Sequence, residues 1–197
     1  MKDRSVRSQE KPQKTNREKF RKSAAREMAY IAVSVALITI CAWISVPVLQ
    51  VPYTLQTLAV ALIGALMGWK RGVAAVAVYI LMGLAGIPVF SNFNAGAGVL
   101  FGATGGYIFG FLFAVVISGL FKMIPIKNKW GRTAMLYGAN IIGLSVCYFF
   151  GTAWFTAMYH CSVAYALTVC VLPYLIADAI KLLVAAVLAV RLEHVIK

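Results

Sequence analysis

The stretch TLQTLAVALIGALMGWKRG, residues 54–72, decides the fold class of this protein. It is an uncharged, mostly apolar run that ends at Lys70 and Arg71. A helix of about 20 such residues is long enough to cross the hydrocarbon core of a bilayer. Basic residues that directly follow a span are typical of its cytoplasmic end. The stretch therefore predicts a membrane helix whose C-terminal end faces the cytoplasm.

Five more apolar stretches repeat this pattern, with prolines or basic residues between them. Of the 197 residues, 61% are hydrophobic and only 13% are charged, which lies outside the range of soluble globular domains. We therefore expect an all-α, multi-pass membrane protein with six transmembrane helices in one domain, residues 28–197, after a basic cytoplasmic tail, residues 1–27. The six predicted spans are residues 28–46, 54–69, 73–87, 107–123, 133–156 and 167–190.

The placement of the basic residues supports one orientation. The formal net charge is +13, and ten of the nineteen Lys and Arg precede residue 28. If the N-terminus is inside, every Lys and Arg except Lys181 falls on a cytoplasmic segment, as the positive-inside rule requires. We expect both termini in the cytoplasm and the protein in the cell membrane. The tail has no aromatic cluster on which bases would stack, so we expect no nucleic-acid partner.

Catalytic and metal-binding motifs are missing from the sequence. It contains no H-E-x-x-H, no G-x-S-x-G and no Walker A sequence, so the chain is not expected to be an enzyme or to hydrolyse ATP. The cysteines show no C-x-x-C spacing, and most lie in apolar runs, so we interpret them as core residues. We expect no metal and no cofactor, and a binding or transport function. The four cysteines are Cys41, Cys147, Cys161 and Cys170.

The last apolar stretch carries two opposite charges. In IADAIKLLVAAV, residues 176–187, Asp178 and Lys181 are three positions apart and therefore share one helical face. Lys181 lies about 15 Å before Arg191 along a helix, which predicts a place near the middle of the bilayer. A charge there costs about 2.5 to 3.5 kcal/mol on insertion scales. A structural ion pair is one interpretation, but we favour a ligand-binding function for the pair.

The outer segment over residues 88–106 is the least regular part of the chain. Its glycines, aromatic rings and amides suit a lid or pocket wall that is open to the outside, with a plain loop as the alternative. Gln56 lies one turn into the second span and is a further candidate ligand contact on the same side of the membrane. The candidate ligand contacts from the irregular segment are Phe90, Asn92, Phe93 and Asn94.

Small residues form a stripe on the first helix. The spacing i, i+4, i+7, i+11 puts four alanines along one face, on which another helix can pack closely. The partner helix could belong to this chain or to another protein. The four residues are Ala25, Ala29, Ala32 and Ala36.

Several motifs together resemble the BioY family, the biotin-binding S components of energy-coupling-factor (ECF) transporters. They are VPYTLQTLAVALIGALMGWKRG, GLAGIPVF, GVLFGATGGYIFGF and the D-x-x-K of Asp178 and Lys181. The resemblance covers about residues 24–191 and implies a protein that captures biotin from outside. It also implies two kinds of partner, a transmembrane coupling protein and two ABC-type ATPases, with the alanine stripe as docking surface. The chain departs from the family at Ala103, where proline is usual, and over residues 91–97, which leaves the choice between Asn92 and Asn94 open.

The chemistry of biotin agrees with this resemblance. Asp178 would accept a ureido N–H and Lys181 would donate to the ureido carbonyl, so that each charge gains a partner. Asn92 or Asn94 would complete the contacts, and Phe90 and Phe93 would pack on the thioether ring. The reverse assignment, with Lys181 on the biotin carboxylate, stays open. In the first assignment the carboxylate relies on backbone N–H groups, Thr104, Tyr107 or water.

Three other functions remain possible from the sequence. An S component for riboflavin or thiamine would keep the architecture and change the pocket. A stand-alone secondary transporter or proton-coupled channel would use Asp178 as a proton site. A membrane-embedded enzyme or a purely structural subunit fits least well.

Overall fold

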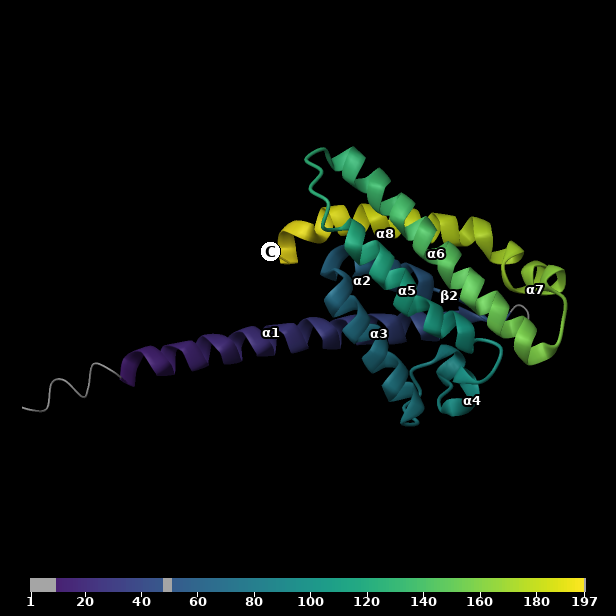
Figure 1. Cartoon of the computed structure of the whole chain (residues 1–197), viewed down its shortest axis with the longest axis horizontal. Helices are drawn as coiled ribbons and strands as arrows, with labels where there is room; N and C mark the ends of the chain where they lie inside the picture. The colour runs from purple at the N-terminus through teal and green to yellow at the C-terminus, as the bar shows by residue number, and fades with distance from the viewer. Residues whose placement is uncertain (1–9, 48–50, 197) are drawn as a thin grey trace, which may run out of the picture.

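The computed structural model describes residues 10–47 and 51–196. Its long helices gather into one bundle (Figure 1), which confirms the all-α class. They are α1 (Glu10–Trp43), α2 (Gln56–Met67), α3 (Trp69–Leu84), α5 (Gly105–Phe121), α6 (Lys129–Tyr159) and α8 (Leu175–Ile196). Shorter elements connect them: β1 (Ser45–Val46), β2 (Tyr53–Thr54), η1 (Ser91–Phe93), α4 (Ala97–Leu100), α7 (Val163–Cys170) and η2 (Leu172–Tyr174).

Glycines let the central helices approach closely. α5 packs along α6, and α2 packs against both α5 and α8. Gly106 of α5 lies against Trp154 of α6, and Gly110 lies against Cys147 one turn further on. A side chain at either glycine would overlap its neighbour on α6. The small-residue pairs that the sequence contains on α5 therefore serve packing within the bundle.

The first helix is longer than the apolar run that predicts it. α1 begins at Glu10, passes the basic segment and projects beyond the bundle (Figure 1). Lys, Arg, Glu and Gln are good helix formers, which accounts for a helix through this polar sequence. A bidentate ion pair from Arg71 to Glu27, with distances of 2.5 and 2.6 Å, joins α1 to α3 where α1 leaves the bundle. Residues 1–9 of the expected tail lie outside the described residues.

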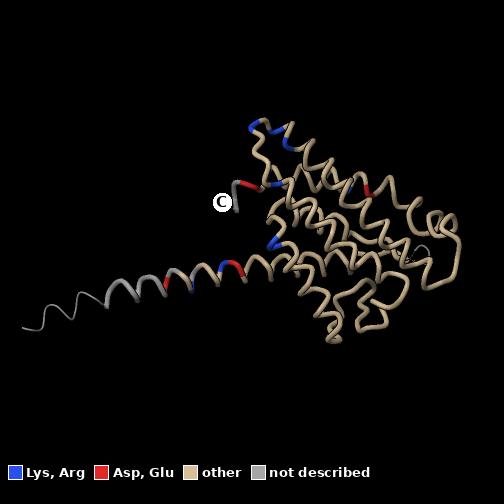
Figure 2. The backbone as a smooth tube through the Cα atoms, in the orientation of Figure 1, with Lys and Arg blue, Asp and Glu red and all other residues tan. Residues whose placement is uncertain are grey.

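Basic residues gather at one end of the bundle. Figure 2 shows them in blue on the projecting part of α1, at the start of α3, at the start of α6 and near the C-terminus. A second ion pair lies at this end, where Arg132 of α6 donates to Glu193 of α8 at 2.7 Å. The folded bundle thus gathers basic residues at one end, as the sequence predicts.

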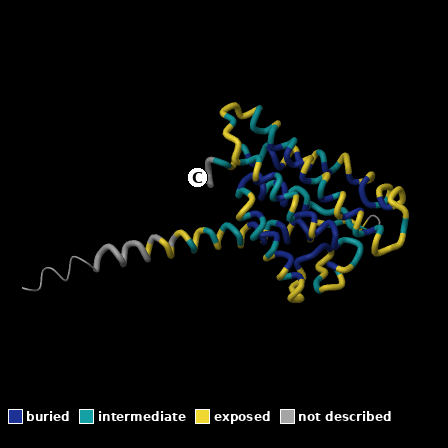
Figure 3. The backbone as a smooth tube through the Cα atoms, viewed as in Figure 1, coloured by how far each residue is buried: buried dark blue, intermediate teal, exposed yellow. Residues whose placement is uncertain are grey.

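Within residues 10–47 and 51–196, two helices are long and apolar enough to cross a bilayer by their length and composition alone, Ser23–Trp43 and Lys129–Tyr159. α2 and α5 are apolar but shorter. Many large apolar residues of the described bundle are exposed. Figure 3 marks the exposed residues of every type in yellow along the backbone. Leu81, Phe149 and Ile176 are 63%, 69% and 80% exposed. Such a surface is typical of helices that face lipid, and the count of six spans stays a prediction.

The prediction of one continuous sixth helix over residues 167–190 is wrong. The chain instead forms α7, the 3-10 turn η2 and then α8. Pro173 is the physical reason, because it has no N–H to donate and its ring clashes with the preceding helical turn. Val171 before it leaves the helical conformation, with φ −124° and ψ −57°. α8 therefore begins at Leu175, and α7 lies at the end of the bundle opposite its basic residues (Figures 1 and 2).

Candidate functional site

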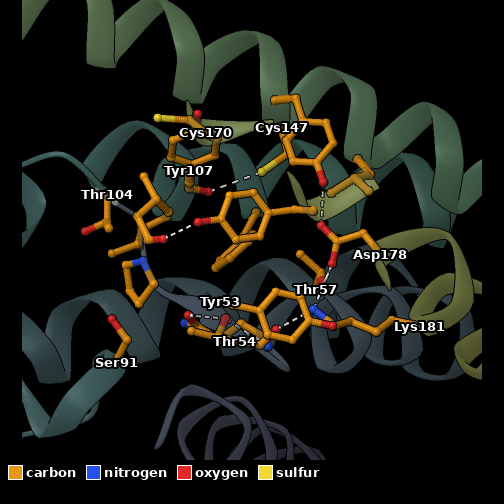
Figure 4. A pocket seen from close by; sticks show the side chains of 18 residues that line it. Tyr53, Thr54, Thr57, Ser91, Thr104, Tyr107, Cys147, Cys170, Asp178 and Lys181 are labelled. Atoms are coloured by element: carbon orange, nitrogen blue, oxygen red, sulfur yellow. Dashed lines mark hydrogen bonds and ion pairs between the residues drawn. The ribbon is translucent and has the colours of Figure 1, made fainter. Parts of the chain in front are cut away.

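A cavity opens between α2, α5, α6 and α8, beside the hairpin of β1 and β2 (Figure 4). Its empty volume is about 640 Å³ when the open mouth is included, but the centre of a water molecule can reach only about 70 Å³ of it. It is therefore a narrow cleft between side chains. The lining residues are Val51, Pro52, Tyr53, Thr54, Gln56, Thr57, Ser91, Thr104, Tyr107, Ile108, Phe111, Leu144, Cys147, Tyr148, Cys170, Tyr174, Asp178 and Lys181.

Asp178 is the most densely bonded polar side chain of this cavity. It is 3% exposed. Its Oδ1 accepts hydrogen bonds from Thr57 Oγ1 at 2.9 Å and Lys181 Nζ at 2.8 Å, and its Oδ2 accepts one from the Tyr148 hydroxyl. These donors come from α2, α8 and α6, so three helices converge on one carboxylate. Hydrogen bonds to a charged acceptor are strong, and they offset the desolvation of the buried charge.

Lys181 is held on its other side by the β-hairpin. Its Nζ donates to the backbone carbonyl of Thr54 at 2.6 Å and lies 3.7 Å from the ring centroid of Tyr53. The ammonium therefore has an anion, a carbonyl dipole and an aromatic face around it. This cage keeps the charge at the cavity wall instead of letting it extend along the helix to water.

The pair lies near the N-terminal end of α8. The sequence predicts Lys181 near the middle of the bilayer from its distance to Arg191, and α8 begins at Leu175. At about 1.5 Å per residue, Asp178 lies only about 5 Å and Lys181 about 9 Å from the start of α8. The depth of Lys181 in a bilayer stays a prediction, because the break at Pro173 changes where the helix begins and leaves its spacing from Arg191 along α8 unchanged. The charges are shielded instead by the tyrosines of the hairpin and of η2, which stack with centroids 5.9 Å apart.

Gln56 and Tyr107, two further predicted contacts, also line the cavity. The Gln56 amide donates to the hydroxyl of Tyr79 at 2.7 Å, which fixes its orientation at the start of α2. The buried hydroxyl of Tyr107 has no hydrogen-bond partner among the described residues. This hydroxyl is buried near the side chains of Thr152 and Cys170, and ligand contact by Tyr107 stays a prediction.

The four residues predicted from the irregular outer segment lie outside the cavity lining. Phe90 is fully buried and packs edge-on against Tyr79, and Phe93 is exposed and stacks on Trp43 at 4.9 Å. Asn92 accepts a hydrogen bond from Ser45, and Asn94 donates to the Ser91 carbonyl. From η1 only Ser91 reaches the cavity. Ligand contact by these four residues stays a prediction, while their present contacts hold the loop to α1 and α3.

Tyr148 is the contact that sequence reasoning missed. It lies within a long apolar helix, where a tyrosine is easily interpreted as an apolar wall. Its hydroxyl in the interior of a membrane helix was the available signal, because a buried Tyr O–H needs an acceptor. The packing of α6 on α8 shows that this acceptor is Asp178, which the sequence alone does not reveal.

The predicted alanine stripe lies on the outer surface. The four alanines of the stripe are exposed, although α1 packs on α2 and α3 with its opposite face. Internal packing therefore does not account for the stripe, which leaves it free to contact another molecule.

Gly151 of α6 allows Tyr107 to occupy its position at the cavity. A methyl group at residue 151 would overlap the Tyr107 ring, whereas one at Gly138 of the same helix would meet nothing within 4 Å. We expect Gly151→Ala to lower stability by about 1 to 3 kcal/mol through overpacking. Gly138→Ala should be neutral or stabilising, by up to about 1 kcal/mol, because alanine favours the helix. Thermal unfolding of both variants in detergent measures this, and equal melting temperatures would contradict it.

A sequence model of the BioY family matches residues 11–197. This chain belongs to the BioY family. The match includes both Asp178 and Lys181.

Curated members of the BioY family align over most of their length. Biotin transporter BioY of Thermotoga maritima is 39% identical over 168 residues, covering 85% of this chain and 96% of that protein. Probable biotin transporter BioY of Pyrococcus horikoshii is 36% identical over 169 residues, covering 86% of this chain and 97% of that protein. Membership of the BioY family confirms the expectation of a membrane transport component rather than an enzyme.

A solved structure has the same fold as this BioY family member. It is the 2.1 Å crystal structure of the S-component for biotin from an ECF-type ABC transporter. The TM-score is 0.78 at 26% sequence identity, and the alignment covers 88% of this chain and 93% of that chain. The likeness therefore extends over most of both chains.

Proposed function

We propose that this chain is the S component of a biotin uptake system and captures biotin from outside the cell. The observation that carries the proposal is the buried pair of Asp178 and Lys181 in the wall of a cavity, within a chain of the BioY family. A buried ion pair inside a membrane bundle is by default a functional site. The names of the relatives and of the solved structure support biotin as the ligand.

The proposed recognition uses the hydrogen-bonding capacity left at the pair. Oδ2 of Asp178 accepts one hydrogen bond, from Tyr148, and so retains a lone pair for a ureido N–H. Lys181 has three N–H donors and uses two of them on oxygen atoms, so the third can reach the ureido carbonyl. Tyr107 and Gln56 would orient the rest of the molecule. In the competing assignment, the Lys181 ammonium binds the carboxylate of biotin instead of its ureido carbonyl.

We place the protein in the cell membrane as a six-helix bundle with both termini in the cytoplasm. The gathering of basic residues at the end where α1 begins and α8 ends supports this orientation (Figure 2). The hairpin, η1 and α7 then lie toward the outside, and the cavity beneath them opens outward.

Transport would require partners that this chain lacks. We propose that the exposed alanine stripe of α1 docks on the transmembrane coupling protein of an ECF module, whose two ABC-type ATPases supply the energy. Small side chains allow close backbone approach between helices in lipid, which supports a helix as the docked element. The bundle would then tilt to present its cavity to the cytoplasm.

Calorimetric titration of the purified protein tests the ligand assignment. We expect binding of biotin, and no heat from riboflavin or thiamine at the same concentrations. Biotin methyl ester should bind about as well as biotin if the pair contacts the ureido group, because the ester keeps that group unchanged. Loss of ester binding would indicate that Asp178 and Lys181 contact the carboxylate end of biotin. Absence of biotin binding would overturn the proposal, and uptake by the chain alone in liposomes would contradict the need for partners.

A further inference from the structure

A second polar group lies below the candidate binding site. Asn140 of α6 is 3% exposed. Within the described part of the chain, neither its Nδ2 nor its Oδ1 has a hydrogen-bond partner. Burying an amide without partners is unfavourable, and nearly all such groups in proteins are bonded to protein or to ordered water. The side chain therefore needs a bound polar molecule.

Asn140 faces a small cavity that adjoins the binding site. Its lining includes Leu182 of α8, and Thr57, Leu144 and Cys147 line both this cavity and the larger one. Asn140 precedes Tyr148 by eight residues, which is about 12 Å or two turns along the same face of α6. Leu182 follows Asp178 by one turn of α8. The small cavity is thus the next layer of the bundle, toward its basic end.

The size of this cavity limits what it can hold. The room for the centre of a water molecule is about 10 Å³, which is about what one water requires and far too little for a ring of a vitamin. Apart from Asn140 and Thr57 the lining is mostly aliphatic or aromatic. One water bonded to these two side chains fits both the volume and the polarity.

We propose that Asn140 binds one buried water molecule, and that this water orients the Thr57 hydroxyl toward Asp178. The Thr57 proton is already donated to Asp178 Oδ1 at 2.9 Å, so the threonine oxygen is left as an acceptor. The water donates to that oxygen and to the Asn140 carbonyl, and it accepts from the Asn140 amide. Asn140 is then a positioning residue for the candidate site, an inference that rests on the proposed function.

A double-mutant cycle measured by biotin titration tests this link. Asn140→Leu keeps the approximate volume and removes the water ligand, and we expect about 3- to 10-fold weaker binding, the loss typical of one hydrogen bond. Thr57→Val keeps the shape and removes the hydroxyl. The double variant should bind no more weakly than Thr57→Val alone, because the water acts only through that hydroxyl. Ser145→Ala, which removes a hydroxyl bonded within its own helix at 2.9 Å, is the matched control.

The outcomes separate this inference from the proposed function. Wild-type affinity in Asn140→Leu, or strictly additive losses in the double variant, would overturn the link to Asp178. If Asn140→Leu does not fold, Asn140→Ala replaces it with the same expectation. If the parent protein does not bind biotin, the proposed function fails. In that case a high-resolution crystal structure still tests the water site. A water molecule bonded to Asn140 and Thr57 would support the proposal, and a cavity without a water molecule would overturn it.

Discussion

Asp178→Asn is expected to weaken biotin binding by roughly 30- to 4,000-fold, which corresponds to the loss of about 2 to 5 kcal/mol when one partner of a buried charge pair is removed. The substitution keeps the size of the side chain. It leaves the Lys181 ammonium, 2.8 Å away, without its anion in a buried site. It also replaces a charged acceptor of the ureido N–H by a neutral one. Calorimetric titration beside the parent protein measures the loss.

Two further variants separate ligand contact from the cost of an unpaired charge. Asp178→Asn combined with Lys181→Met removes both charges, so it should restore thermal stability without restoring biotin binding. Glu193→Gln breaks the ion pair of Arg132 with Glu193, which is of the same chemical type but lies at the basic end of the bundle. Its biotin affinity should match that of the parent. Near-parental affinity in the double variant would mean that the pair is only structural.

Ala29→Trp should abolish complex formation with the ECF module while leaving biotin binding intact. The residue lies within the exposed alanine stripe of α1, away from the cavity. An indole ring there would hold a partner helix away from the backbone, and small residues at such interfaces are needed for close packing. Copurification of the coupling protein with a tagged chain, together with biotin uptake by cells, measures the effect. We expect loss of both, with unchanged calorimetric affinity of the isolated chain.

The control for this experiment is an equally large change on another surface. Ala134 is also exposed but lies on α6, away from the alanine stripe. Ala134→Trp should leave copurification and uptake at the parental level. If both tryptophan variants lost the partner equally, the docking surface would not be specific to α1. Retention of the partner by Ala29→Trp would contradict docking through the stripe.

The helical fold follows from features that are local in the sequence. Apolar runs and the basic residues at their ends predict helices and their direction, because both signals act within one helix and its immediate flanks. These signals placed α2, α3, α5 and α6 within a few residues of the observed bounds. They failed at Pro173, where the apolar run continues but the helix cannot.

The shared helical face of Asp178 and Lys181 follows from the sequence alone, since a spacing of three depends only on the geometry of an α-helix. The alanine stripe of α1 follows from the sequence for the same reason. Family membership, too, is a property of the sequence. None of these conclusions requires knowing which helices are neighbours.

Only the tertiary structure decided which groups surround the pair. Thr57 and Tyr148 reach Asp178 from 121 and 30 residues away in the chain. Periodicity shows which face of a helix a residue occupies but not which side chain of another helix lies opposite. The same limit explains why the sequence does not show that Asn92 accepts a hydrogen bond from Ser45 and that Asn94 donates to the backbone of its own loop. Contacts between helices depend on how whole elements pack, and that arrangement is decided by the sum of many long-range interactions.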